Sequence, residues 1–184
     1  MSVLRLAEVS APPWGKPLLS EITFDVPVGS ILGIVGPNGA GKTSLLRLIA
    51  GDFTPDKGEI QIMDRPATDL SAGALAKSLA YLPQFSLLSF PYTVEEVVML
   101  GRTPHETGLD EDRHIVDSVL AKVDIAALRG RLYTQLSGGE KQRICIARAL
   151  AAEPELIICD EVTSALDTIV AKAILDLLQR LQRE

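Results

Sequence analysis

The chain has 184 residues, a formal net charge of −6 and a hydrophobic fraction of 47%. This composition supplies enough apolar side chains for a sizeable core and excludes a disordered chain. The negative net charge argues against a dedicated DNA- or RNA-binding protein, so no nucleic acid partner is expected.

Neither a secretory signal nor a membrane span is visible in the sequence. The N-terminus, MSVLRLAEVS, lacks an apolar core of the needed length. No run of about 18 apolar residues occurs. Cys145 and Cys159 stand among apolar residues and are too few for a disulfide framework, which is typical of buried thiols in a reducing compartment. We therefore expect a cytoplasmic protein.

The first third of the chain predicts strands around one helix. Residues 22–26 (ITFDV) alternate apolar and polar side chains, as a half-buried strand does. Residues 31–35 (ILGIV) form a continuous apolar run, which predicts a fully buried parallel strand. A glycine-rich turn follows, then a helix through SLLRLIAG that ends near Gly51. Residues 57–63 (KGEIQIM) predict a further strand.

The glycine-rich turn, GPNGAGKT at residues 36–43, matches the P-loop pattern of nucleotide-binding proteins. Its glycines allow the backbone to bend so that successive N–H groups point at phosphate oxygens, and the following helix adds its positive end. Lys42 would reach the β- and γ-phosphates, and the Thr43 hydroxyl would bind Mg²⁺. The predicted ATP-binding residues of this loop are Gly36, Pro37, Asn38, Gly39, Ala40, Gly41, Lys42, Thr43 and Ser44.

Residues from about 86 to 135 predict an inserted helical lobe. One helix would begin at Thr93, because Glu96 three residues later completes a capping box. A second helix is preceded by three acids from residue 110. The apolar residues on one face of this second helix are Ile115, Val116, Val119, Leu120 and Val123.

Strand and helix patterns return after the lobe. Residues 140–152 predict a helix, residues 156–159 (LIIC) a short buried strand, and the apolar spacing from Val170 onward a last helix. Asp160 and Glu161 follow the strand directly. With a P-loop upstream, Asp160 is expected to hold Mg²⁺ and Glu161 to polarise an attacking water, although an acid pair can also cap the next helix.

The segment LSGGEKQR, residues 136–143, matches the signature motif of the ATP-binding subunits of ABC transporters. With the P-loop and the acidic strand end, it makes the sequence resemble this family over essentially its whole length. The resemblance implies an α/β P-loop NTPase with a mainly parallel core sheet, an N-terminal antiparallel β subdomain and the helical lobe at about 86–135. Residues 1–184 would then be a single ABC ATPase domain that is incomplete at its C-terminus.

Further site residues follow from the resemblance alone. Trp14 would stack on adenine, or simply pack. Gln84, in YLPQ, would act beside Glu161 in catalysis and touch Mg²⁺, and Asp167, in SALD, would lie in the D-loop that crosses a dimer interface. The metal set implied is Thr43, Gln84 and Asp160. The signature residues that would contact ATP held by a partner subunit are Ser137, Gly138, Gly139 and Glu140, and Ser137 with Glu140 also reads as a capping box.

The family resemblance implies ATP and Mg²⁺ as cofactors, a homodimer or pseudo-dimer with a second ABC ATPase domain, and integral-membrane permease subunits. The chain would then sit on the cytoplasmic face of the inner membrane. Two departures stand out. Val162 replaces the usual proline after the catalytic glutamate, and the family's switch histidine is not found before Glu184.

The cargo is less well defined by the sequence. SFPYTVEEVVMLGRTPH, residues 89–105, is similar to ATPases of haem, iron–siderophore and cobalamin importers, which favours haem or iron–siderophore import. LIICDEVTSALD looks more like the peptide and nickel importer group. A soluble ABC protein acting on ribosomes or DNA, and a fragment that does not hydrolyse ATP, remain alternatives.

Overall fold

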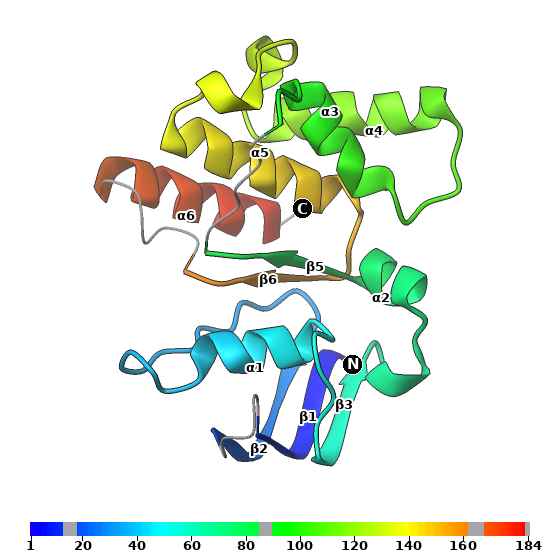
Figure 1. Ribbon diagram of the computed structural model, residues 1–184, viewed down its shortest axis with the longest axis vertical. Coiled ribbons are helices and arrows are strands. Elements are labelled where there is room, and N and C mark those ends of the chain that lie inside the picture. Colours follow the sequence, from blue (N-terminus) through cyan, green and yellow to red (C-terminus); the bar gives the residue numbers. More distant parts are fainter. Residues whose placement is uncertain (13–17, 85–89, 162–167, 183–184) are drawn as a thin grey trace. The chain divides into compact units, whose positions relative to one another are not determined.

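The computed structural model describes residues 1–12, 18–84, 90–161 and 168–182 (Figure 1). The chain divides into two compact units, Met1–Leu79 and Ala80–Glu184. The described helices are α1 (Lys42–Ile49), α2 (Ala72–Ser78), α3 (Val94–Met99), α4 (Leu109–Lys122), α5 (Gly138–Ala151) and α6 (Thr168–Gln182). The described strands are β1 (Ser2–Ala11), β2 (Leu19–Pro27), β3 (Lys57–Ile62), β4 (Arg65–Pro66), β5 (Leu79–Leu82) and β6 (Leu156–Cys159). Short 3-10 turns are η2 (Ala67–Asp69), η3 (Leu100–Arg102), η4 (Ala126–Leu128) and η5 (Tyr133–Gln135).

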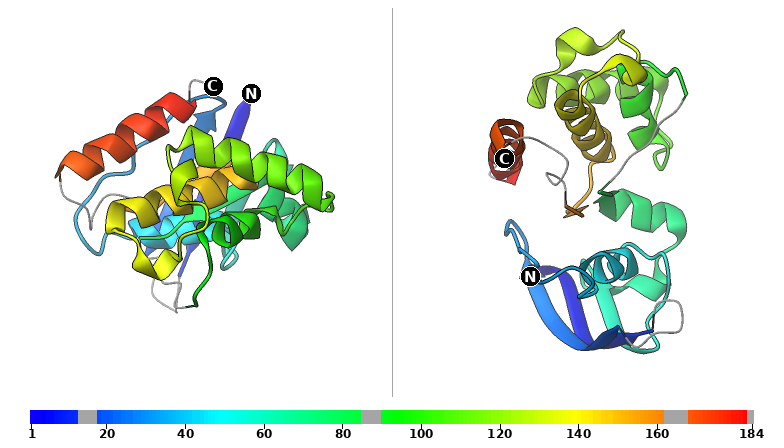
Figure 2. Two further views of the ribbon diagram at one scale, coloured as in Figure 1. Left: turned by 90° about the horizontal axis from the view of Figure 1, so that it is seen from above. Right: turned by 60° about the vertical axis from the view of Figure 1, so that its left-hand side comes forward.

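The first unit is built on an antiparallel sheet in the order β2-β1-β3-β4, whose curl is visible in the right-hand view of Figure 2. In the register, Leu6 of β1 lies opposite Phe24 of β2 and Ile60 of β3. A bulge follows at Glu8, whose φ of 51° is left-handed. The Glu8 N–H donates to Thr23 Oγ1 at 2.9 Å, so the bulge leaves this donor satisfied. The sheet confirms the predicted N-terminal antiparallel β subdomain.

Residues 31–35 do not form the predicted strand. This segment has no regular secondary structure, and Ile31 and Val35 expose 64% and 93% of their surface. A parallel strand depends on hydrogen bonds to a neighbour that is distant in sequence. All strand pairs described within Met1–Leu79 are antiparallel, so the segment has no parallel neighbour among the described residues of that unit. The prediction of a buried parallel strand at these residues is therefore wrong.

Helix α1 follows the P-loop as predicted. Its inner face buries Leu45, Leu48 and Ile49. The helix ends at Ile49, and the chain turns away at Gly51, whose φ of 84° is the left-handed conformation that glycine adopts at low cost. The predicted stop at Gly51 is therefore confirmed.

The second unit combines a short parallel sheet of β5 and β6 with helices α3 to α6 (Figure 1). This sheet, together with the helices, confirms the α/β class. The two helical patterns of the predicted lobe form α3 and α4, and α3 starts with the expected capping box at Thr93 and Glu96. Helices α3 to α6 and strand β5 all contribute to the core of this unit, whose buried members include Leu82, Val97, Val116, Leu120, Ile144, Ile146 and Ile174.

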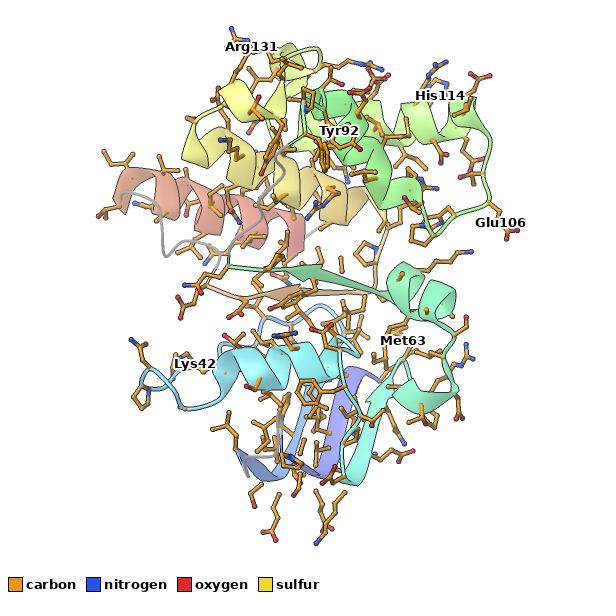
Figure 3. All side chains as sticks on the ribbon, in the orientation of Figure 1. Lys42, Met63, Tyr92, Glu106, His114 and Arg131 are labelled. Carbon is orange, nitrogen blue, oxygen red and sulfur yellow. The ribbon has the colours of Figure 1, made fainter. Side chains whose placement is uncertain are left out.

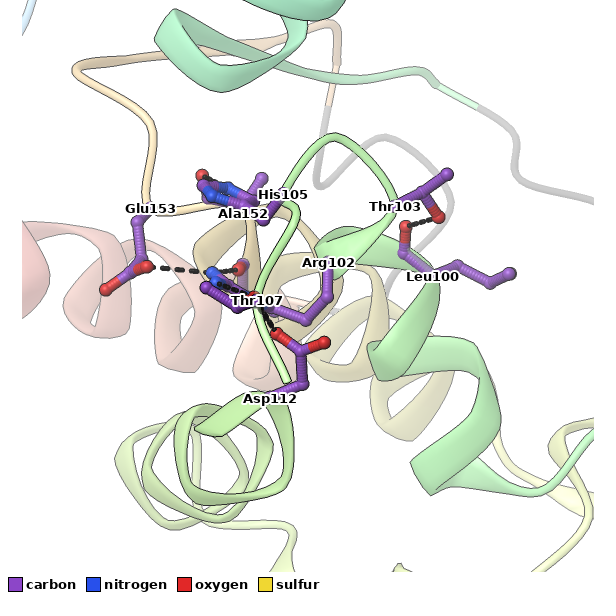
Figure 4. A network of polar contacts seen from close by, with 9 residues as sticks. Leu100, Arg102, Thr103, His105, Thr107, Asp112, Ala152 and Glu153 are labelled. Carbon is purple, nitrogen blue, oxygen red and sulfur yellow. Dashed lines mark hydrogen bonds and ion pairs between the residues drawn. The ribbon is translucent and has the colours of Figure 1, made fainter. Parts of the chain in front are cut away.

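A buried arginine ties η3 to α4 and to the end of α5 (Figure 4). The Arg102 side chain is 3% exposed, and its Nε donates to Asp112 Oδ1 at 2.8 Å. Its Nη1 donates to the Ala151 carbonyl and to Glu153 Oε2, each at 2.7 Å. Thr107 Oγ1 donates to the same Asp112 oxygen at 2.6 Å. Hydrogen bonds from Thr107, then from Arg102, hold the pKa of the Asp112 carboxyl below its ordinary value. The network joins three segments that are distant in sequence.

Replacing Arg102 by methionine is expected to lower the free energy of unfolding by roughly 3 kcal/mol at pH 7, because a buried charge network loses its central donor. Asp112 has a depressed folded-state pKa, so its contribution is present above the unfolded pKa and is lost as the pH falls through the folded value. The stability curves of wild type and Arg102→Met should therefore converge in acid. Urea unfolding between pH 3 and pH 7 measures both effects.

The matched control is Arg113→Met, since Arg113 lies on α4 with a 58% exposed side chain and a long 3.9 Å ion pair to Asp110. This control should stay within about 0.5 kcal/mol of wild type. An equal loss in both variants would contradict the role given to the network.

Candidate functional site

The P-loop closes the start of α1 with a tight turn, in which the Ala40 N–H donates to the Pro37 carbonyl at 3.3 Å. Lys42 lies at the first position of the helix, as labelled in Figure 3. Its Nζ donates to the carbonyl oxygens of Gly36 at 2.8 Å and Pro37 at 3.0 Å. The ammonium group is thus held at the loop's own backbone, and residues 36–40 are exposed around it.

Gly41 is the residue that this turn most requires. Its φ is 90°, and a Cβ there would lie 3.1 Å from Leu18 Cγ and 3.2 Å from Leu19 Cδ2. Any other residue would meet both the backbone penalty and the leucines. As the N-cap of α1, Gly41 also has no side chain with which to cap the helix. The positive end of α1 is therefore directed into the loop, where an anion would be stabilised.

The acidic pair, Asp160 and Glu161, follows β6, and its two side chains have different surroundings. Asp160 is 4% exposed, its N–H donates to the Leu82 carbonyl of β5 at 2.9 Å, and its Oδ2 accepts a hydrogen bond from Tyr81 at 3.1 Å. Glu161 is exposed and has a left-handed φ of 46°. A non-glycine residue in that region costs about 1–2 kcal/mol, a cost often found at functional sites.

Gln84 meets Glu161 directly. Gln84 Nε2 donates to Glu161 Oε2 at 2.6 Å across 77 residues of sequence. Both residues follow neighbouring strands, β5 and β6, so their meeting is a consequence of the sheet. The structure thus brings together the two residues that were predicted to act in catalysis.

Tyr81 is a site residue that the sequence prediction missed. It orients the buried Asp160 carboxylate through its hydroxyl group. The signal for it was its position in YLPQ, three residues before Gln84 in the same strand-and-loop segment. Cys159, next to Asp160, is inert by contrast, because burial raises the pKa of its thiol to about 11.

The donor chemistry of these residues suits magnesium. The predicted ligands Thr43, Gln84 and Asp160 all offer oxygen atoms, and Mg²⁺ usually takes one or two carboxylates together with phosphates and waters. No cluster of three or more histidine, cysteine or acidic side chains able to hold a metal occurs in the part of the chain that the structure describes. Each of the three predicted ligands, taken by itself, offers the kind of oxygen donor that Mg²⁺ takes when it is bound together with phosphate.

The signature segment forms the start of α5. Ser137 is the N-cap: its N–H donates to Glu140 Oε2 at 2.8 Å, and its Oγ donates to the same oxygen at 2.7 Å. The Glu140 N–H donates back to Ser137 Oγ at 3.3 Å, which completes the predicted capping box. These bonds, from the Ser137 side chain first and then its backbone, lower the pKa of the Glu140 carboxyl. Ser137 and Gly138 remain exposed at the tip.

The capping box alone does not distinguish this helix. Thr93 and Glu96 make the same set of bonds at the start of α3. What differs at α5 is the pair of glycines after the cap. Trp14 and Asp167, the two remaining predicted site residues, lie outside the described residues.

The comparison with protein families matches residues 19–164 to the ABC transporter family. The chain belongs to this family. Among curated relatives of this ABC chain, the hemin import ATP-binding protein HmuV of Thermobifida fusca is 40% identical over 168 residues, which cover 90% of this chain and 59% of the relative. The HmuV protein of Streptomyces coelicolor is 44% identical over 155 residues, covering 83% and 55% respectively. This ABC chain thus spans little more than half the length of these relatives.

A solved structure of an inward-facing ABC transporter, assigned to the metal-chelate type, contains a similar chain. The similarity has a TM-score of 0.85 at 32% identity and covers 100% of this chain and 69% of that one. These findings confirm the resemblance to ABC ATP-binding subunits of the haem and iron–siderophore group. No described helix of this ABC chain is both long enough and apolar enough to span a bilayer.

Replacing Gln84 by glutamate is expected to place two carboxylates in contact at the end of the sheet. One pKa of the pair would rise in the folded state, because like charges oppose each other's ionisation. A raised folded-state pKa adds stability that is present below the unfolded pKa and lost as the pH rises through the folded value. Relative to wild type, the variant should lose about 0.5 kcal/mol between pH 4 and pH 7, as for a partly screened pair.

Urea unfolding at the two pH values measures this loss. Gln84→Met is the control, since it removes the amide without adding a charge and should show the same loss at both pH values. A glutamate variant that behaves like the methionine variant would contradict the contact between positions 84 and 161.

Proposed function

We propose that this chain belongs to the ATP-binding and ATP-hydrolysing subunit of an ABC importer. The observation that carries the proposal is the hydrogen bond between Gln84 and the Glu161 carboxylate, next to the buried Asp160. A family P-loop accounts for binding of the nucleotide, but only a positioned base accounts for hydrolysis. The proposal therefore assigns nucleotide binding and hydrolysis to different parts of the chain.

Binding would use the P-loop. The backbone N–H groups of residues 36–41 and the positive end of α1 would hold the phosphates, and Lys42 would exchange its bonds to Gly36 and Pro37 for phosphate oxygens. Thr43, Gln84 and Asp160 would hold Mg²⁺, which neutralises phosphate charge when bound. Trp14 is proposed to stack on the adenine ring.

Hydrolysis would use Glu161 as the general base. Its carboxylate accepts a proton from a water molecule while the water oxygen attacks the γ-phosphorus, and the bond to the leaving ADP oxygen breaks. The products are ADP and inorganic phosphate. Gln84, which already donates to Glu161, would orient both the carboxylate and that water.

A second ABC ATPase domain is the proposed partner at the signature. An anion at the exposed start of α5 would be stabilised by the helix dipole and by the first-turn N–H groups, and the γ-phosphate of ATP on another subunit is such an anion. Ser137, Gly138, Gly139 and Glu140 would form this contact, with Asp167 at the same interface. Two ATP molecules would then link two chains, and hydrolysis would release them.

The cargo and location are proposed from the relatives. The two HmuV relatives are hemin import ATP-binding proteins, so haem or a related iron chelate is the proposed cargo of the complete transporter. Permease subunits would carry that cargo, and the chain would attach to them on the cytoplasmic face of the membrane.

Replacing Lys42 by alanine should weaken ATP binding by roughly 10- to 100-fold, because charge-assisted hydrogen bonds to phosphate are lost. Titration with a fluorescent ATP analogue measures the dissociation constant. Lys77→Ala is the control, since Lys77 is an exposed lysine on α2 of the same unit. Equal affinity in the Lys42 variant and wild type would count against the P-loop as the nucleotide site.

Replacing Glu161 by glutamine should allow ATP to bind without being hydrolysed, so that Mg-ATP causes the chain to self-associate. Sedimentation velocity measures the association. In this background, Ser137→Ala should weaken association about tenfold, by loss of a contact worth about 1.4 kcal/mol. Thr93→Ala is the matched control, because it removes an equivalent capping box from α3 at a similar cost of about 1 kcal/mol in stability. Equal effects of the two alanines on association would remove the signature from its proposed role.

A further inference from the structure

The second glycine of the signature has a neighbour that the phosphate-binding role does not require. A Cβ at Gly139 would lie 2.8 Å from Cγ1 of Val170 on α6, closer than real Cβ atoms approach another carbon. Gly139 has ordinary helical backbone, so its conformation does not call for glycine. Glycine inside a helix costs about 0.5–1 kcal/mol relative to alanine, so its presence needs another reason. The close approach of α6 is such a reason.

Beyond the contact with Val170, α6 and α5 contribute side chains to one core cluster. Ile174 and Leu177, one and two turns further along α6, are buried in the same core cluster as Ile144 and Ile146 of α5. At its other end, α6 is held by Arg180, whose Nη2 donates to the Lys122 carbonyl of α4 at 2.5 Å. Helix α6 therefore cannot move away from α5 without opening the core.

Val170 is a stiff neighbour for the glycine. A β-branched side chain in a helix has essentially one χ1 rotamer, so its methyl group cannot simply rotate aside. Any side chain at position 139 would have to shift either α6 or the first turn of α5. The exposed tip at Ser137 and Gly138 belongs to that first turn.

Helix α6 is also the next described element after the acidic end of β6. It begins at Thr168, seven residues beyond Glu161. One chain thus contains a helix that follows its own proposed base and touches the start of its own signature helix. In the proposed function, the base serves the ATP of its own chain, whereas the signature serves the ATP of the partner.

We propose that Val170 is a positioning residue for the signature: by packing against Gly139 it sets the first turn of α5 at the place where a partner's phosphate binds. The inference rests on the proposed function and deepens it. The signature of each chain is held by the helix that follows its own hydrolytic end, so the two ATP sites are linked through α6. Packed helices shift as units, which makes such a link mechanically direct.

The test is a rescue experiment in the Glu161→Gln background, with Mg-ATP-dependent self-association measured by sedimentation velocity. Gly139→Ala should weaken association at least tenfold, and Val170→Ala alone about threefold, because the first turn of α5 then loses the side chain that sets its place. The double variant should return to within threefold of the parent, because the smaller residue at 170 makes room for the added methyl group. Ile169→Ala, at the 82% exposed neighbouring position, should give no rescue.

The alternative is that Gly139 is glycine only because phosphate must approach its backbone. The double variant would then remain as weak as Gly139→Ala, and this result would overturn the proposal. A double-mutant cycle of urea unfolding without nucleotide is a second test, since the effects of substitutions at positions 139 and 170 on the free energy of unfolding should not be additive. Additive effects in urea would overturn the proposal as well.

Failure of the proposed function would give a different experimental result. If the Glu161→Gln parent does not associate in Mg-ATP, the proposed ATP-linked pairing fails, and the positioning role of Val170 fails with it. If the parent associates but Val170→Ala does not rescue Gly139→Ala, only the positioning role is wrong.

Discussion

The pairing of β5 with β6 is the constraint on which the hydrolytic half of the site depends. The Asp160 N–H donates to the Leu82 carbonyl at the end of that sheet. Gln84 and Glu161 follow the two strands, and Gln84 Nε2 lies 2.6 Å from Glu161 Oε2. Parallel strands end at the same edge, so residues that follow them meet without any local sequence relation. The sheet also explains the division of labour in the acidic pair. Asp160 still belongs to the ladder and is buried, whereas Glu161 has left it and is exposed in a left-handed conformation.

Two helix starts in this chain are suited to anions in different ways. At α1, glycine is the N-cap, and its missing side chain leaves the helix end to the loop and Lys42. At α5, Ser137 caps the helix and is itself bonded to Glu140, so the tip is already satisfied and ordered. The first arrangement suits a ligand enclosed by a loop, and the second suits a ligand offered by another molecule to a rigid surface.

The rigidity of the second start comes from the core beneath it. Helix α5 shares one core cluster with buried residues of α3, α4 and α6. At its last residue, the Ala151 carbonyl accepts a hydrogen bond from Arg102. Gly101 contributes to the same packing, because a Cβ there would lie only 2.1 Å from the Arg148 carbonyl oxygen of α5. Glycine therefore allows close approach at both ends of this helix, at Gly101 to its last turns and at Gly139 to its first.

The sequence by itself determined the features that depend on neighbours within about four residues. These are the P-loop turn with its left-handed glycines, the capping boxes at Thr93 and Ser137, the end of α1 near Gly51, and the apolar faces of the helices. Backbone conformation and capping are local, so residue type and spacing are enough to predict them. The family of the chain was also within reach, because its motifs combine several such local features in a fixed order.

Only the tertiary structure decided which distant residues meet. Residues 31–35 have the composition of a buried strand but lie exposed, since composition does not choose a pairing partner. Arg102 carries no sign of burial in its local sequence, yet it is buried because Asp112 and the Ala151 carbonyl converge on it. Tyr81 on Asp160 and Val170 against Gly139 are contacts of the same kind. Each depends on the packing of whole elements, which is a property of the assembled core and not of any one segment.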